Sequence, residues 1–91
     1  MAKSLAGVRV LVVEDNYFVA QIIDKTLRNV GCVALGPLPH LTDALDVTAK
    51  EACDVAVLNI DLGGRELVYP VAEILSVRRL AFLFVTVTLA R

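Results

Sequence analysis

Short apolar runs alternate along the chain with segments of helical periodicity. Residues 8–13 are β-branched and almost wholly apolar, which is typical of a central parallel strand covered on both sides, and they end at an acidic pair. Asn16 is suited to cap the helix that follows, and Gly31 is suited to end it. The apolar positions of that helix are Phe18, Val19, Ile22, Ile23, Leu27 and Val30. The pattern predicts a strand, an acidic turn and a helix.

The next segment repeats this order in a shorter form. Residues 32–35 predict a second strand, which we expect to end at Gly36 and Pro37 because both residues favour turns. A second helix then places five small or apolar side chains on one face, namely Leu41, Ala44, Leu45, Thr48 and Ala52.

The last third of the chain continues the alternation. Residues 55–60 predict a third buried strand, followed by a glycine-containing loop at 61–64. A third helix is marked by Leu67, Val68, Val71, Ile74 and Leu75, and Pro70 suits only its first turn. We expect Arg78 and Arg79 to complement the dipole at its carboxyl end. Residues 80–89 predict a fourth strand, apolar on both sides.

Strands that alternate with helices in this way predict right-handed crossovers and a parallel α/β sheet in three layers. The hydrophobic share of 57% exceeds the roughly 45–50% of an ordinary soluble domain, which agrees with strands buried on both faces. The apolar run at 80–90 is about half of the ~20 residues that cross a bilayer, so we expect no membrane span. A chain of 91 residues has room for one domain.

Charge and cysteine usage exclude several classes of function. The net charge of −1, from nine basic and ten acidic residues, gives no basic surface for nucleic acid or for a membrane. The first seven residues have no apolar core of a secretory signal, so we expect a cytoplasmic protein. Cys32 and Cys53 lack metal-ligand spacing, and we expect both to be reduced, partly buried thiols.

Polar residues gather where the predicted strands end. Glu14 and Asp15 follow the first strand, Asn59 and Asp61 lie at the end of the third, and Thr86 lies near the end of the fourth. In a parallel sheet these ends share one edge, where ligands usually bind. Adjacent carboxylates repel one another unless a cation or a polar network separates them, and hard oxygen ligands suit Mg²⁺. The alternative is a solvated turn with acids that cap a helix, and these residues by themselves leave both interpretations open.

Three segments in the same order resemble the receiver domain of response regulators in bacterial two-component signalling. They are residues 10–16 (Val-Leu-Val-Val-Glu-Asp-Asn), residues 54–64 around Asn59, and residues 84–86 (Phe-Val-Thr). The resemblance runs along nearly the whole chain and implies a flavodoxin-like sheet. We therefore expect one truncated receiver-like domain over residues 1–91, with strand order 2-1-3-4 and without the family's fifth strand and last helices.

The resemblance also implies roles for the clustered polar residues. Glu14 and Asp15 would hold Mg²⁺, with the Asn59 position and the backbone carbonyl of Asp61 completing the metal site, and Thr86 would be the switch hydroxyl. Asn59 stands where the family has its phosphate-accepting aspartate. A carboxamide is a poor nucleophile, so we expect aspartyl phosphorylation to fail there and Mg²⁺ affinity to be weakened. The alternative acceptor is Asp61, which otherwise is an ordinary loop acid.

These expectations predict a phosphorelay receiver module, impaired in phosphorylation, that is not an enzyme and binds a sensor histidine kinase or another signalling protein. The fourth strand would leave an open edge, and such edges pair with other chains, so we expect a homodimer through it. Two alternatives are an Mg²⁺-dependent phosphotransfer enzyme on a related α/β sheet and a non-functional fragment of a longer receiver.

Overall fold

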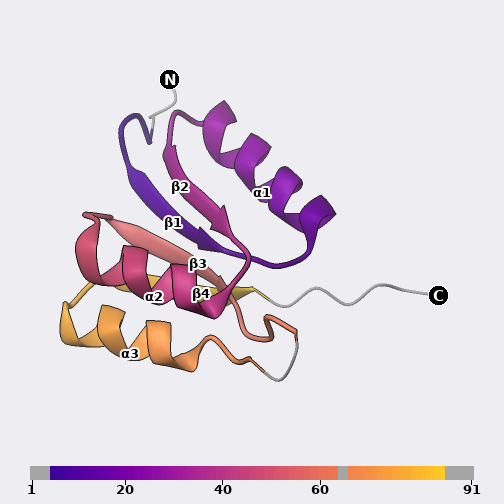
Figure 1. The fold of residues 1–91 in the computed structure, drawn as a ribbon. Coiled ribbons are helices and arrows are strands. Elements are labelled where there is room, and N and C mark those ends of the chain that lie inside the picture. The colour runs from indigo at the N-terminus through magenta and orange to yellow at the C-terminus, as the bar shows by residue number, and fades with distance from the viewer. Residues whose placement is uncertain (1–4, 64–65, 86–91) are drawn as a thin grey trace.

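The computed structural model describes residues 5–63 and 66–85, and in them a parallel sheet is flanked by helices on both faces (Figure 1). The elements in chain order are β1 (Arg9–Val13), α1 (Tyr17–Asn29), β2 (Val33–Leu38), α2 (Leu41–Lys50), β3 (Val55–Asn59), α3 (Tyr69–Val77) and β4 (Ala81–Val85). The four strands lie in the order β2-β1-β3-β4, and all neighbours are parallel. The predicted fold class and strand order are confirmed.

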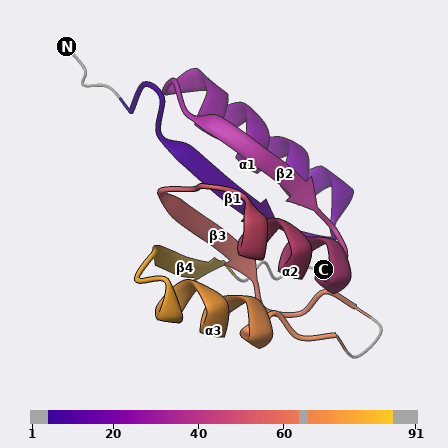
Figure 2. The ribbon, with the colours of Figure 1, turned by 60° about the vertical axis from the view of Figure 1, so that its left-hand side comes forward.

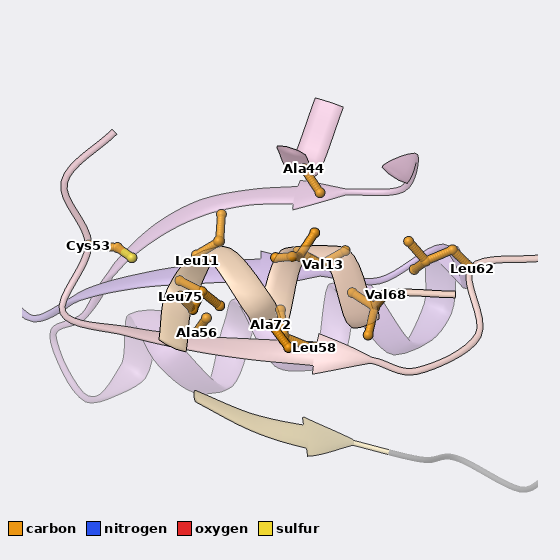
Figure 3. Close-up of a cluster of buried hydrophobic side chains, with 11 residues drawn as sticks. Leu11, Val13, Ala44, Cys53, Ala56, Leu58, Leu62, Val68, Ala72 and Leu75 are labelled. Atoms are coloured by element: carbon orange, nitrogen blue, oxygen red, sulfur yellow. The ribbon is translucent and has the colours of Figure 1, made fainter. Parts of the chain in front are cut away.

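The three layers follow from which side chains of each strand are covered. Helix α1 lies on one face of the sheet, and α2 and α3 lie on the other (Figures 1 and 2). The buried cluster beneath α2 and α3 is shown in Figure 3 and consists of Leu11, Val13, Ala44, Cys53, Ala56, Leu58, Leu62, Val68, Val71, Ala72 and Leu75. The cluster on the α1 face is smaller and consists of Val10, Val12 and Cys32. Alternate residues of β1 thus enter opposite cores, as a strand buried on both faces requires.

Local sequence signals set the helix ends much as predicted. The side chain of Asn16 accepts a hydrogen bond from the Val19 N–H at 3.1 Å and so caps α1. Just beyond the helix, Gly31 has φ +89°, a conformation that favours glycine. Pro70 lies in the first turn of α3, where a missing N–H costs no intrahelical hydrogen bond.

The prediction that Gly36 and Pro37 end the second strand is wrong, because β2 continues through both residues to Leu38. β2 has only one neighbour in the sheet, and an edge strand tolerates a proline that cannot donate to a second neighbour. The β1–β2 register shifts between Leu11 and Val13, which accommodates the irregular segment. The Glu14 N–H then donates to the Leu38 carbonyl at 3.1 Å, so β2 accompanies β1 as far as the acidic pair.

Two further predictions about the second and third helices need correction. Helix α2 ends at Lys50, so Ala52 lies outside it and is exposed. Arg78 ends α3, but its guanidinium donates to the carbonyls of Thr48 and Glu51 at the carboxyl end of α2. Those carbonyls lack intrahelical partners, so Arg78 caps the neighbouring helix as well as closing its own.

Strand β4 lies at the sheet edge beside β3. The aromatic ring of Phe82 packs against the cluster under α2 and α3, and the ring of Phe84 meets that of Tyr69 on α3 at 5.7 Å. Leu83 faces the α1 side and is 51% exposed. The predicted continuation of this strand through residue 89, including Thr86, lies outside the described residues. None of the helices described is both long enough and apolar enough to cross a bilayer.

Candidate functional site

The polar residues after β1 and β3 meet because the two strands are direct neighbours. Val13 pairs with Leu58 in the parallel register, so the next residue of each strand, Glu14 and Asn59, emerges at the same edge. Leu58 and Val13 are both fully buried and fix the two strand ends under α2 and α3. The site is therefore held by the core immediately before it.

The carboxamide of Asn59 lies between the two acidic side chains. Its Nδ2 donates to Glu14 Oε2 at 2.7 Å and to Asp15 Oδ1 at 3.1 Å. Its Oδ1 faces the other way, 3.4 Å from the backbone N of Asp61, which donates to it. One neutral side chain thus bridges two carboxylates that would otherwise repel each other.

The two acids differ in their surroundings. Glu14 is only 3% exposed, whereas Asp15 is exposed. Besides Asn59, Glu14 Oε2 accepts from the backbone N–H of Asn16 at 3.1 Å. A buried carboxylate is costly without such donors. The first turn of the α1 segment and the end of β3 together supply them.

The loop after β3 closes beside Asp15. The Gly63 N–H donates to Asp61 Oδ1 at 2.8 Å, so the carboxylate of Asp61 is turned into its own loop. Gly63 has φ +80°, and a β-carbon there would lie 3.3 Å from Asp15 Oδ2. This close approach and the positive φ both favour glycine.

The sequence-predicted site is brought together only in part. Glu14, Asp15 and Asn59 share hydrogen bonds, and Asp61 reaches them through its backbone N–H. The roles that we assigned to these residues stay predictions. Thr86, the expected switch hydroxyl, lies outside the described residues.

A cavity of about 260 Å³ adjoins the acidic pair, between α1 and the end of β2. Its lining consists of Glu14, Asp15, Tyr17, Ala20, Gln21, Asp24, Pro37 and Pro39. Asp24 accepts from Arg28 Nε at 2.9 Å through Oδ2, while its Oδ1 is buried without a partner in the described structure. Asp24 was not among the predicted site residues, although its place one helical turn after the buried Ala20 was a signal that it lies near the sheet.

The donor set as folded does not fit Mg²⁺. Across residues 5–63 and 66–85, no group of three or more His, Cys, Asp or Glu side chains is placed to hold a metal ion. Two carboxylates are present, but the group that points between them is the NH₂ of Asn59, which offers protons where a cation needs oxygen.

Solved structures with the same fold include several response regulators. The response regulator PhyR from Brucella abortus matches 89% of this chain at TM-score 0.79 with 21% identity. The signal receiver domain of a modulated diguanylate cyclase from Desulfovibrio desulfuricans G20 matches 91% at TM-score 0.78 with 25% identity. The MaeR response regulator, in a structure bound to beryllium trifluoride, matches 91% at TM-score 0.70 with 18% identity.

The same matches extend over 34% of the PhyR chain, 67% of the diguanylate cyclase receiver chain and 70% of the MaeR chain. No protein-family model and no curated protein sequence matches this chain. The resemblance to receiver domains that the sequence indicated is confirmed at the level of the fold.

Proposed function

We propose that this chain is a receiver-type module of two-component signalling that takes up no phosphoryl group at Asn59. The observation that carries the proposal is the Asn59 carboxamide, held between Glu14 and Asp15 at the end of β3 in a receiver fold. The module would act by binding a sensor histidine kinase or another signalling protein, and not as an enzyme.

The chemistry of the site supports a silent acceptor. A carboxylate attacks phosphorus through an anionic oxygen, whereas the Asn59 oxygen is neutral and faces the Asp61 N–H. The nearby carboxylate of Asp61 is engaged by the Gly63 N–H and lies in an exposed loop. Neither residue offers a free, activated nucleophile in this arrangement.

A phosphodonor experiment tests the proposal. The chain and its Asn59→Asp variant would be incubated with Mg²⁺ and acetyl phosphate, and intact mass would show whether one phosphoryl group is gained. We expect no gain for the unaltered chain and a single gain for Asn59→Asp. Asn29→Asp makes the same change of charge at an exposed position at the far end of α1 and serves as the control.

Each other outcome of that experiment has a definite meaning. A phosphoryl group on the unaltered chain, mapped to Asp61, would overturn the silent-acceptor proposal. Sustained release of phosphate by the unaltered chain would instead indicate the phosphotransfer enzyme that we considered as an alternative. Failure of Asn59→Asp to gain a phosphoryl group would argue against a receiver pocket in this chain.

We further propose that two copies associate through β4. This strand forms one edge of the four-stranded sheet, and its Leu83 and Phe84 are 51% and 41% exposed. Edge strands with apolar side chains pair readily with another chain, and association would cover them.

A charge placed on the edge strand tests the dimer. We expect Leu83→Lys to convert a dimer into a monomer in sedimentation equilibrium, because a lysine at a pairing edge opposes association. Val77→Lys is the matched control, since Val77 is 84% exposed and belongs to α3 and not to the edge strand. A monomeric unaltered chain at every concentration, or equal loss of the dimer in both variants, would contradict association through β4.

A further inference from the structure

We infer that the Asn59 carboxamide takes the place of a divalent cation between Glu14 and Asp15, so that this acidic pair is held without metal. The inference concerns cation binding and stability, and it holds or fails independently of any signalling role. Its basis is the direction of each hydrogen bond around Asn59.

Both protons of the Asn59 NH₂ group are used. With Nδ2 2.7 Å from Glu14 Oε2 and 3.1 Å from Asp15 Oδ1, each carboxylate receives one of them. A side-chain amide has two such protons, so this one group satisfies both acids at once. Hydrogen bonds to an ionised acceptor are stronger than neutral ones, so the two donated bonds stabilise both carboxylates.

The orientation of the carboxamide is fixed from its other end. Asn59 Oδ1 lies 3.4 Å from the Asp61 backbone N, whose N–H points toward it. Rotating the amide by half a turn would set its NH₂ against that N–H and its oxygen against two carboxylates. Every contact would then become repulsive, so the network itself assigns the amide direction.

A cation at this point and the observed amide exclude each other. For Mg²⁺ to bind Glu14 and Asp15 together, the NH₂ of Asn59 must leave the space between them. The Asn59 oxygen can join the metal only after the unfavourable rotation. Glu14, at 3% exposure, would also exchange a donor already in place for an ion that dehydrates reluctantly.

The Asn59→Asp variant reverses these relations. One oxygen of the new carboxylate can still accept from the Asp61 N–H, but the other would lie beside Glu14 and Asp15 where Nδ2 now donates. Three carboxylates would then share one small space, which is unfavourable until a cation enters. A single substitution should therefore convert a metal-independent site into a metal-dependent one.

Thermal unfolding of both proteins, in EDTA and in Mg²⁺ at equal ionic strength, tests the inference. For the unaltered chain, we expect the same Tm in Mg²⁺ as in EDTA. The control Asn29→Asp should likewise have the same Tm in both conditions. Asn59→Asp should have a lower Tm in EDTA than in Mg²⁺, because Mg²⁺ at about 100 times its Kd should raise that Tm by roughly 10–20 °C.

Amide NMR of the unaltered chain gives a second measurement that does not depend on folding of a variant. Added Mg²⁺ should leave the N–H signals of Asn16, Asp61 and Gly63 unmoved, because these groups surround the occupied space. A saturable shift of these signals, or a Tm of the unaltered chain that rises with Mg²⁺, would overturn the inference. Either result would leave untouched the proposal that Asn59 takes up no phosphoryl group. The inference about the cation and the proposed function can therefore be tested separately.

Discussion

The two faces of the sheet are built by the same strands but are covered very differently. Beneath α2 and α3, Leu11, Leu58 and Leu75 are completely buried in one continuous cluster. On the opposite face, α1 covers a much smaller cluster around Val10 and Val12. The outer side of α1 leaves Phe18 76% and Ile22 65% exposed. Successive strand residues therefore give the sheet two apolar faces. The face under α2 and α3 is covered more completely than the face under α1.

This difference bears directly on the candidate site. Glu14 and Asn59 directly follow Val13 and Leu58, which belong to the fully covered cluster. The positions of the polar side chains are thus set by the tightly packed face, under α2 and α3.

The largest expected effect comes from making the same substitution on each face. Leu58→Ala should lower the free energy of unfolding by about 2–5 kcal/mol, because it removes a fully buried side chain and leaves a cavity. Leu83→Ala, at a half-exposed position of the neighbouring strand, should cost less than about 1 kcal/mol. Urea unfolding of both variants measures the difference.

Equal decreases in the free energy of unfolding of the two leucine variants would contradict the difference in coverage between the two faces. They would mean that Leu83 is covered in solution, and sedimentation equilibrium of Leu83→Ala would then show whether a second copy covers it.

An arginine on each face gives the next contrast. Arg78→Ala should lower the free energy of unfolding by about 1–2 kcal/mol, because carbonyls of Thr48 and Glu51 at the end of α2 lose a charged donor. Arg28→Ala on α1 removes the ion pair between a largely exposed arginine and the half-buried Asp24, and should cost less, about 0.5–1 kcal/mol. Urea unfolding again decides, and a larger loss for Arg28→Ala would show that α1 contributes more than its small cluster suggests.

The alternation of strands and helices could be predicted because apolar periodicity is local information. The meeting of Glu14 and Asn59 could also be predicted, since the carboxyl ends of parallel strands lie at one edge of the sheet. The passage of β2 through Gly36 and Pro37 could not, because only its place at the sheet edge makes a proline tolerable there.

Long-range side-chain contacts were likewise hidden from the sequence. Arg78 binds the end of α2, about thirty positions earlier in the chain, although its place after α3 suggested a purely local role. The direction of the Asn59 amide depends on the Asp61 N–H, and it places an NH₂ group, not an oxygen, between Glu14 and Asp15. Residue types indicated where polar side chains cluster, but only the structure showed which atoms face each other.

The two cysteines allow the smallest difference between the faces to be measured. Both are free, buried thiols, and one belongs to each cluster. Cys53 lies under the fully covered face, where burial, with a smaller contribution from Asp54, raises its pKa against the opposing effect of Arg78 and Arg9. Because the thiolate is the reactive form, Cys53 should alkylate slowly at neutral pH. Cys32 should react sooner, because the thinly covered face opens locally at lower cost. Timed iodoacetamide labelling with peptide mass mapping gives both rates.

The raised pKa also predicts a small dependence of stability on pH. The folded state favours the neutral thiol of Cys53, so its contribution is complete below the ordinary thiol pKa of 9.0 and is lost as the pH rises above that value. Unfolding free energies measured from pH 8 to 10 should therefore decline more for the unaltered chain than for Cys53→Ala. If the free energy of unfolding declined equally in both proteins, the Cys53 thiol would not be the cause of the pH dependence. In the labelling experiment, faster reaction of Cys53 than of Cys32 would mean that the face under α2 and α3 opens first.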